Sequence, residues 1–90
     1  MNVVEATVEV KNRLGLHLRA ASALAQMIAK FDSEVKIGRG KDLINAKSVT
    51  GLMMLGAAQG TKLKVRVEGA DAREALKAVQ ILFDERFGEE

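Results

Sequence analysis

The chain has 90 residues, of which 48% are hydrophobic and 29% are charged, and this balance is typical of one globular domain that spans residues 1–90. The 14 basic and 12 acidic residues leave a formal net charge of +2 and are dispersed along the chain, so the composition gives little support to nucleic-acid binding. The sequence has no cysteine and a single histidine, which excludes disulfides, thiolate chemistry and metal sites built on cysteine or on several histidines.

The N-terminal third of the chain predicts a strand, a loop and a helix in that order. Apolar residues alternate with polar ones over residues 4–10, which is typical of a half-buried strand. Residues 12–15 are expected to form a loop. From Leu18 the apolar residues take the spacing of one helix face, and residues 31–33 are expected to end that helix.

The middle of the chain predicts a β-hairpin followed by a short helix. Residues 34–37 alternate again, the turn-rich segment 38–42 is expected to form the hairpin loop, and residues 44–46 belong to the returning strand. Ser48 is a favoured N-cap residue for a helix over residues 49–55, which a glycine closes.

The last third of the chain predicts a strand and a helix. Residues 62–68 alternate strictly, and Gly69 ends this strand. Asp71 and Glu74 resemble a capping box, and the final helix is expected to run to about Phe87. The order β-α-β-β-α-β-α, with one polar face on each strand, predicts an α+β open-faced β-sandwich, in which three helices cover one face of a four-stranded antiparallel sheet.

His17 stands between the first strand and the first helix. A lone histidine in such a place is more often a solvated or capping residue than a chemical one. Its position favours chemistry, because the first N–H groups of a helix bind anions and a neutral imidazole nitrogen is a nucleophile. Leu18, Arg19 and Ala20 form the expected anion-binding helix start, and the guanidinium of Arg19 suits phosphate oxygens. These features describe a nucleophile with an anion receptor beside it.

Three segments of the chain resemble one protein family. Residues 15–21, with the sequence GLHLRAA, are similar to the active-site motif of the HPr family, the histidine-containing phosphocarriers of the bacterial phosphoenolpyruvate-dependent sugar phosphotransferase system. Residues 45–56, NAKSVTGLMMLG, resemble the family's regulatory-serine segment, and residues 69–72, GADA, resemble its Gly-x-Asp-Ala near the last helix. The resemblance covers nearly the whole chain and implies the same open-faced sandwich.

The resemblance implies a stoichiometric phosphocarrier rather than an enzyme, with no cofactor and no metal ion. His17 would take a phosphoryl group on Nδ1 from phosphorylated enzyme I and hand it to an EIIA protein or domain of a sugar transporter. Arg19 would stabilise the group during transfer. Ala20 stands where the family usually has proline, and alanine supplies a backbone N–H at the helix start that proline lacks. Leu18 is bulkier than the residue that the family usually has at that position. These departures leave a nitrogen-regulatory or other specialised branch open.

Ser48 has two interpretations. The residues alone favour a simple N-cap, whose hydroxyl needs no further purpose. The resemblance implies a regulatory site that HPr kinase/phosphorylase would phosphorylate. The added negative charge at a helix start would inhibit transfer from enzyme I without unfolding the protein.

The helix expected over residues 49–55 holds more apolar residues than the core can accept. A few exposed apolar residues are normal on a protein surface. The resemblance implies instead a docking patch for partner proteins beside His17, formed by Val49, Thr50 and Met53.

Two other classes of function remain to be weighed. A small regulatory protein of the same fold, acting mainly by phosphorylation-dependent binding to partner proteins, stays open as the alternative. An RNA- or metal-binding module is disfavoured, because no aromatic residue lies on a predicted strand and no cysteine ligand is present. We expect a cytoplasmic protein without membrane insertion, since residues 1–7 lack signal-peptide features and no apolar run approaches the roughly 18 residues of a membrane span. We expect a monomer, since no long exposed apolar face requires a dimer.

Overall fold

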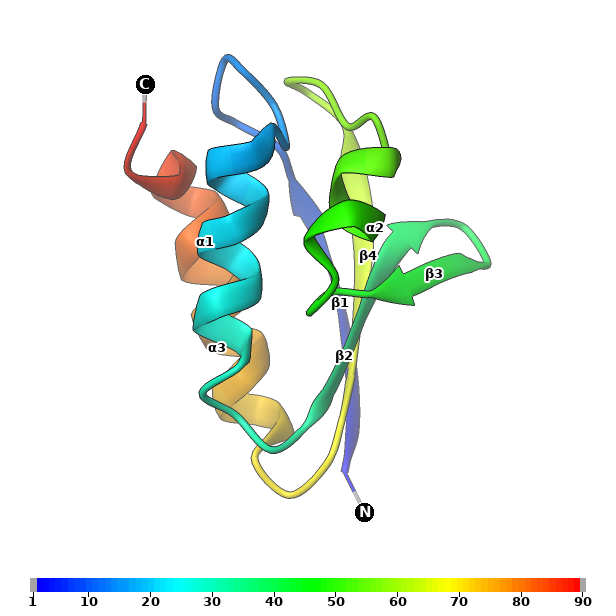
Figure 1. Cartoon of the computed structure of the whole chain (residues 1–90). Coiled ribbons are helices and arrows are strands. Elements are labelled where there is room, and N and C mark those ends of the chain that lie inside the picture. The colour runs from blue at the N-terminus through cyan, green and yellow to red at the C-terminus, as the bar shows by residue number, and fades with distance from the viewer. Residues whose placement is uncertain (1, 90) are drawn as a thin grey trace.

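The computed structural model describes residues 2–89, which form a four-stranded sheet with three helices on one face (Figure 1). The strands are β1 (Val3–Glu9), β2 (Glu34–Arg39), β3 (Asp42–Asn45) and β4 (Lys62–Glu68). The helices are α1 (Leu18–Ile28), α2 (Val49–Met54) and α3 (Ala72–Asp84), and a short 3-10 turn, η1 (Arg86–Gly88), follows α3. The predicted element order and fold class are confirmed.

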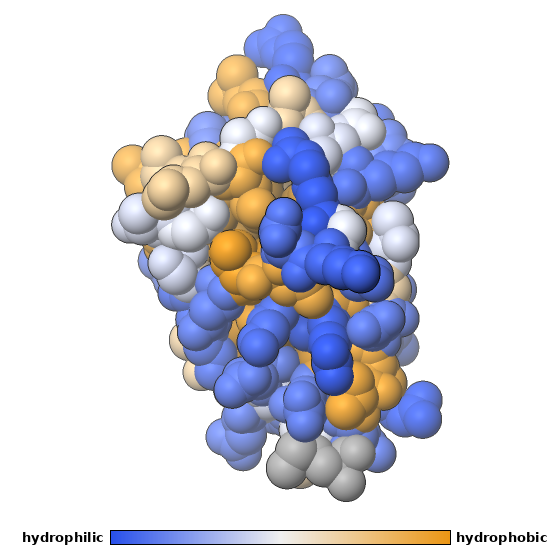
Figure 2. Space-filling view, turned by 90° about the vertical axis from the view of Figure 1, so that its right-hand side faces the viewer, coloured by the Kyte–Doolittle hydropathy of each residue, from blue (hydrophilic) through white to orange (hydrophobic). Residues whose placement is uncertain are grey.

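All neighbouring strands in the sheet are antiparallel, in the order β1-β4-β2-β3. The strict alternation of β4 buries Leu63, Val65 and Val67 under the helices and exposes Lys64 and Arg66 on the opposite face. Figure 2 views the molecule from the side that α1 and α3 leave open, and mainly hydrophilic residues cover it. The open face of the sheet thus accounts for many of the charged residues.

The two long helices each bury one stripe of side chains. α3 packs on β1 and β4, and α1 contacts both α3 and α2. Spacing of three and four residues places the buried positions on one side of each helix. These positions are Ala20, Ala21, Leu24, Ala25 and Ile28 in α1, and Ala72, Ala75, Val79 and Phe83 in α3. Within residues 2–89, no helix has the length and apolar character that crossing a membrane would require.

The hairpin loop is shorter than predicted. β2 continues to Arg39 and β3 begins at Asp42, so only two residues form the turn instead of the whole segment 38–42. Backbone pairing of Gly38 with Leu43 extends the ladder into the segment that composition alone assigns to the loop.

α1 also ends earlier than predicted, at Ile28 rather than at residues 31–33. The N–H groups of Lys30 and Phe31 bond to carbonyl oxygens three residues back, at 3.2 and 3.0 Å, which tightens the chain into a turn. Phe31 still packs against the core, but it does so from the turn that follows α1.

α3 ends at Asp84, and Phe87 lies outside it. Arg86 and Phe87 have φ values of 56° and 55°, in the left-handed region, and Gly88 has a φ of 74°. This conformation costs a non-glycine residue about 1–2 kcal/mol. Burial of Phe87 offsets the cost, since its ring packs edge-on against Phe83 with centroids 4.8 Å apart. The left-handed turn sends the following residue back toward the start of α1.

The capping box predicted at the start of α3 is wrong. Asp71 holds the N-cap position, but its side chain makes no capping hydrogen bond to α3. Its carboxylate instead accepts the hydroxyl of Ser33 and the N–H groups of Ser33 and Asp32, the last two at 2.9 Å. These hydrogen bonds, led by the one from the Ser33 hydroxyl, hold the pKa of Asp71 below its ordinary value. Asp71 therefore ties the start of α3 to the turn before β2.

Candidate functional site

His17 lies at the N-cap of α1, where the sequence predicted it. Its backbone is extended, with φ −77° and ψ 179°, and its carbonyl oxygen accepts the N–H of Ala21 at 2.8 Å. The imidazole makes no capping hydrogen bond to the helix. The ring is therefore positioned beside the helix start without being used to satisfy its backbone.

The loop before His17 is fixed by a close backbone approach. Gly15 has a φ of +73°, and a Cβ at this position would lie 2.5 Å from the carbonyl oxygen of Ala57. The N–H of Leu16 donates to that same oxygen at 2.9 Å. Only glycine fits both the conformation and the space, so Gly15 anchors the histidine loop to the segment after α2.

Three donors converge on the carboxylate of Glu89. Its Oε2 lies 2.7 Å from Nε2 of His17 and 2.9 Å from Nη1 of Arg19. Its Oε1 accepts a hydrogen bond from Nδ2 of Asn12 at 3.0 Å. Two of the predicted site residues, His17 and Arg19, are thus brought together on a single anionic oxygen.

Burial works to raise the pKa of Glu89, but several contacts outweigh it. Hydrogen bonds from Asn12, His17 and Arg19, together with the charge of His17, hold the pKa of Glu89 below its ordinary value. The side chain of Glu89 is 12% exposed, whereas that of Arg19 is 64% exposed. The site therefore holds a shielded carboxylate beside a solvent-accessible guanidinium.

His17 borders two hollows on the surface. The first has a volume of about 290 Å³ and includes the carboxylate of Glu89, and its lining residues are Arg13, Leu14, His17, Arg19 and Glu89. The second, of about 240 Å³, lies against the segment after α2, and its lining residues are Leu14, Leu16, His17, Gly56, Ala57 and Ala58. A partner can thus reach the histidine without a rearrangement of the core.

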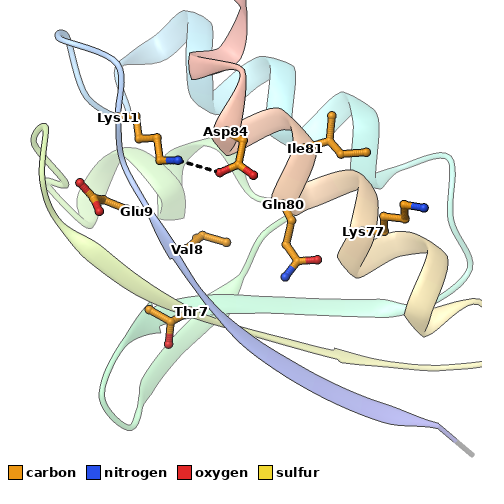
Figure 3. A pocket seen from close by; sticks show the side chains of 8 residues that line it. All are labelled: Thr7, Val8, Glu9, Lys11, Lys77, Gln80, Ile81 and Asp84. Carbon is orange, nitrogen blue, oxygen red and sulfur yellow. Dashed lines mark hydrogen bonds and ion pairs between the residues drawn. The ribbon is translucent and has the colours of Figure 1, made fainter.

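A larger hollow of about 490 Å³ lies between β1 and α3 (Figure 3). Lys11 and Asp84 form an ion pair of 2.9 Å across one end of it, and His17 and Arg19 are not among its lining residues. The hollow with the larger volume therefore lies away from His17 and Arg19.

Ser48 is an N-cap, as its residue type predicts. Its hydroxyl oxygen accepts the N–H of Gly51 at 3.0 Å, and the residue is exposed at the start of α2. The glycine at position 56 follows α2 in the left-handed region, with φ 59°. The capping role is therefore confirmed.

The residues predicted to dock partners have unequal exposure. Met53 is 44% exposed and Thr50 is exposed, while Val49 is half-buried and packs against the core. Two exposed apolar residues beside the histidine, Leu14 at 65% and Leu18 at 60%, extend the apolar surface beyond the predicted set. Because α2 contacts α1, this surface lies on neighbouring elements (Figure 1).

Two members of the site, Asn12 and Glu89, were not predicted from the sequence. Asn12 is fully buried, and its Nδ2 also donates to the carbonyl oxygen of Gly15 at 2.7 Å, within the loop that leads to His17. Glu89 is 72 positions from His17 along the chain. No local pattern joins residues at such a separation, so only the folded chain could reveal this contact.

Comparison with known proteins identifies the family. The family model described as the phosphotransferase-system HPr component phosphorylation site matches residues 4–85. The phosphocarrier protein HPr of Xylella fastidiosa is 41% identical over 88 residues, which cover 98% of this chain and 99% of that protein. The phosphocarrier protein NPr of Shewanella violacea is 40% identical over 89 residues, which cover 99% and 98%. The crystal structure of HPr-C-His from Thermoanaerobacter tengcongensis matches with a TM-score of 0.91 at 42% identity and covers 97% of this chain and 98% of that chain. The chain therefore belongs to the HPr family of phosphocarrier proteins of the phosphotransferase system.

Proposed function

We propose that this protein accepts a phosphoryl group on Nδ1 of His17 from phosphorylated enzyme I and passes it to EIIA proteins or domains of sugar transporters. The convergence of His17 and Arg19 on one anionic oxygen, at 2.7 and 2.9 Å, carries the proposal. The shared oxygen lies at Nε2 and places the guanidinium beside the imidazole, and the exposed side chain of Arg19 is long enough to turn toward a phosphoryl group on Nδ1 of the same ring. A cytoplasmic location and a monomeric state accompany this role.

The helix start supports Nδ1 as the accepting atom. Nδ1 is bonded to Cγ, as is the capping oxygen of an aspartate at an N-cap, whereas Nε2 lies farther out on the ring. A phosphoryl group on Nδ1 therefore faces the first backbone N–H groups of α1, which carry partial positive charge. Leu18, Arg19 and Ala20 supply these groups, and Ala20 keeps a donor that proline would lack.

The transfer needs positioning and charge stabilisation more than any further chemistry. The lone pair of Nδ1 attacks phosphorus, the new N–P bond forms, and the donor's bond to phosphorus breaks with its electron pair leaving on the donor. Arg19 neutralises part of the charge on the phosphoryl oxygens. The reverse step delivers the group to the next acceptor.

Incubation with phosphoenolpyruvate, Mg²⁺ and enzyme I tests the proposal. We expect acid-labile, base-stable phosphate on the wild type and none on His17→Ala. If the wild type takes no label from any cognate enzyme I, the carrier role is rejected.

A regulatory protein of the same fold is the second candidate, and the 40% identity to an NPr favours it. Such a protein would act mainly by phosphorylation-dependent binding. The two roles separate when the phosphorylated protein is mixed with a sugar-transporter EIIA. Rapid delivery of the phosphoryl group supports the carrier, whereas binding of partner proteins without delivery supports the regulator.

Ser48 is proposed as a regulatory phosphorylation site for HPr kinase/phosphorylase. Its exposure at the start of α2 supports this, because a phosphoryl group there stays in solvent and meets the positive end of the helix. Kinase and ATP are expected to label the wild type but not Ser48→Ala, and the modified protein should be a slower acceptor from enzyme I with an unchanged Tm. An unmodified wild type would remove this part of the proposal.

Val49, Thr50 and Met53 are proposed as the docking surface for enzyme I and EIIA. Exposure of Met53 and Thr50 on a helix that packs beside α1 supports this surface. A flexible thioether such as that of Met53 adapts to partners of different shape.

A further inference from the structure

The contact between His17 and Glu89 is built into the fold. Glu89 follows η1, where the left-handed Arg86 and Phe87 turn the chain back toward α1. Phe87 is 5% exposed and packs edge-on against Phe83, so the core fixes the turn. Packing of Phe87 therefore fixes the turn that brings Glu89 to the start of α1, and side-chain contacts then hold its carboxylate at Nε2 of His17.

Glu89 has an anchor that is independent of Arg19. Its Oε1 accepts from Asn12, which is buried and also bonded to the carbonyl oxygen of Gly15 at 2.7 Å. The exposed Arg19 contributes one nitrogen to Oε2, and its long side chain can turn toward a phosphoryl group. Asn12 then still holds the carboxylate on Nε2 of His17.

The carboxylate determines which nitrogen of His17 carries the proton. An ionised carboxylate only accepts hydrogen bonds, so the 2.7 Å contact requires a hydrogen on Nε2. The neutral ring then has its lone pair on Nδ1. We infer that Glu89 is a positioning residue for phosphoryl transfer, which orients the imidazole through Nε2 and so directs the phosphoryl group to Nδ1. This inference rests on the proposed carrier function and adds a residue to it.

The proton stays on Nε2 throughout the cycle. When Nδ1 uses its lone pair to form the N–P bond, the ring becomes positively charged, and the carboxylate of Glu89 stabilises that charge. When the group is handed on, the N–P bond breaks and its electron pair returns to Nδ1. The ring is then neutral with Nε2–H in place, so neither step needs a proton to enter or leave.

The first experiment observes the ring directly and needs no partner protein. The full chain is labelled with ¹⁵N in His17, and NMR spectra are recorded at mildly alkaline pH for the wild type, Glu89→Ala, Glu89→Gln and Glu85→Ala. Glu85 is an exposed residue of the same tail and serves as the matched control. We expect a slowly exchanging Nε2–H in the wild type and the control, and exchange about tenfold faster in Glu89→Ala.

Glu89→Gln is expected to restore slow exchange, because its amide oxygen accepts the same hydrogen bond. A wild-type ring that carries its proton on Nδ1 overturns the inference. So does a Glu89→Ala ring with the wild-type tautomer and exchange rate.

The second experiment measures phosphorylation of the same variants by enzyme I. We expect Glu89→Ala to accept the group about tenfold more slowly, Glu89→Gln to stay within about threefold of the wild type, and Glu85→Ala to be unchanged. A faster Glu89→Ala would mean that the carboxylate competes with the phosphoryl group for Arg19, and would overturn the inference. If the wild type accepts nothing, the proposed function fails, while the NMR spectra still decide where Glu89 places the proton.

Discussion

His17 and Arg19 could be predicted from residue type and spacing, because a histidine at a helix start with an arginine two positions on combines a nucleophile with an anion receptor. Asn12 and Glu89, which hold them, could not. A buried asparagine is a common turn residue, and the glutamate reaches the site only through a left-handed turn that involves two non-glycine residues. Sequence thus indicates the reacting atoms, whereas the atoms that orient them emerge from the fold.

Arg19 is expected to contribute to transfer through its geometry as well as its charge. Arg19→Lys keeps the charge but loses the planar array of donors, so phosphorylation by enzyme I should slow about tenfold, and about 100-fold with Arg19→Ala. Initial rates with labelled phosphoenolpyruvate measure both effects. Arg73→Ala, an exposed change on α3, is the control and should keep the wild-type rate. Equal rates for all variants would contradict a role for Arg19.

Asp71 makes stability depend on pH. Its pKa is lower in the folded chain than its ordinary value of 3.8, so its contribution is complete above that value and is lost as the pH falls through the lowered one. Asp71→Asn should therefore unfold at a lower urea concentration than the wild type at neutral pH. The difference between the two urea midpoints should become smaller below about pH 4. Urea midpoints over this pH range test it.

The control for Asp71 is Asp84→Asn, which alters a carboxylate whose side chain is 69% exposed in its pair with Lys11. That exposed ion pair should contribute little to the urea midpoint at any pH. If the urea midpoints of Asp71→Asn and the wild type differ by the same amount at every pH, the shape of the Asp71 side chain stabilises the fold and its charge does not.

At the scale of elements, alternation and helical spacing predicted β1, β2, β4, α1 and α3, because these patterns follow directly from which face is buried, while turn and capping residues predicted β3 and α2. The ends were less predictable, since they depend on contacts from elsewhere. Asp71 has the residue type and spacing of a capping box, yet Ser33 on a distant turn competes successfully for its carboxylate. Phe87 continues the apolar spacing of α3, yet its burial is achieved after the helix has ended.

The left-handed turn after α3 can be relieved by one substitution. Arg86 is exposed and has a φ of 56°, so Arg86→Gly removes the steric cost and loses little packing. We expect a gain in the free energy of unfolding of about 0.5–1 kcal/mol, after allowance for the greater entropy of glycine in the unfolded chain. Chemical denaturation measures the change.

Arg73→Gly provides the matched comparison, because Arg73 is exposed within α3, where the backbone is right-handed. That variant should lose about 1 kcal/mol. If both glycine variants are destabilised alike, the left-handed turn at Arg86 carries no strain.

At the scale of the whole molecule, the exposed apolar side chains are distributed unevenly. The sheet shows solvent a largely hydrophilic face (Figure 2), while exposed apolar side chains on α1 and α2 lie on the helical side near His17. A protein that serves several partners through one histidine benefits from this division, because one shared surface can be recognised while the rest stays inert.

Met53→Glu tests that division. The substitution should weaken binding to enzyme I about tenfold or more, because a charge would have to be desolvated at the interface, and it should leave the circular dichroism spectrum unchanged. Ile81→Glu is the matched control, since Ile81 on α3 is 46% exposed against 44% for Met53. Isothermal titration calorimetry gives both affinities. Equal affinities for the two variants would remove Met53 from the docking surface.

The placement of Glu89 has a practical consequence for anyone who handles this protein. The two ends of the described chain lie at opposite ends of the molecule, and the C-terminal end is the one near the start of α1 (Figure 1). An affinity tag or a reporter fused after Glu89 would thus emerge beside the reacting imidazole, where it would hinder enzyme I and pull on the carboxylate. The same fusion placed before β1 would lie at the opposite end of the molecule from His17 and would leave phosphoryl transfer unchanged.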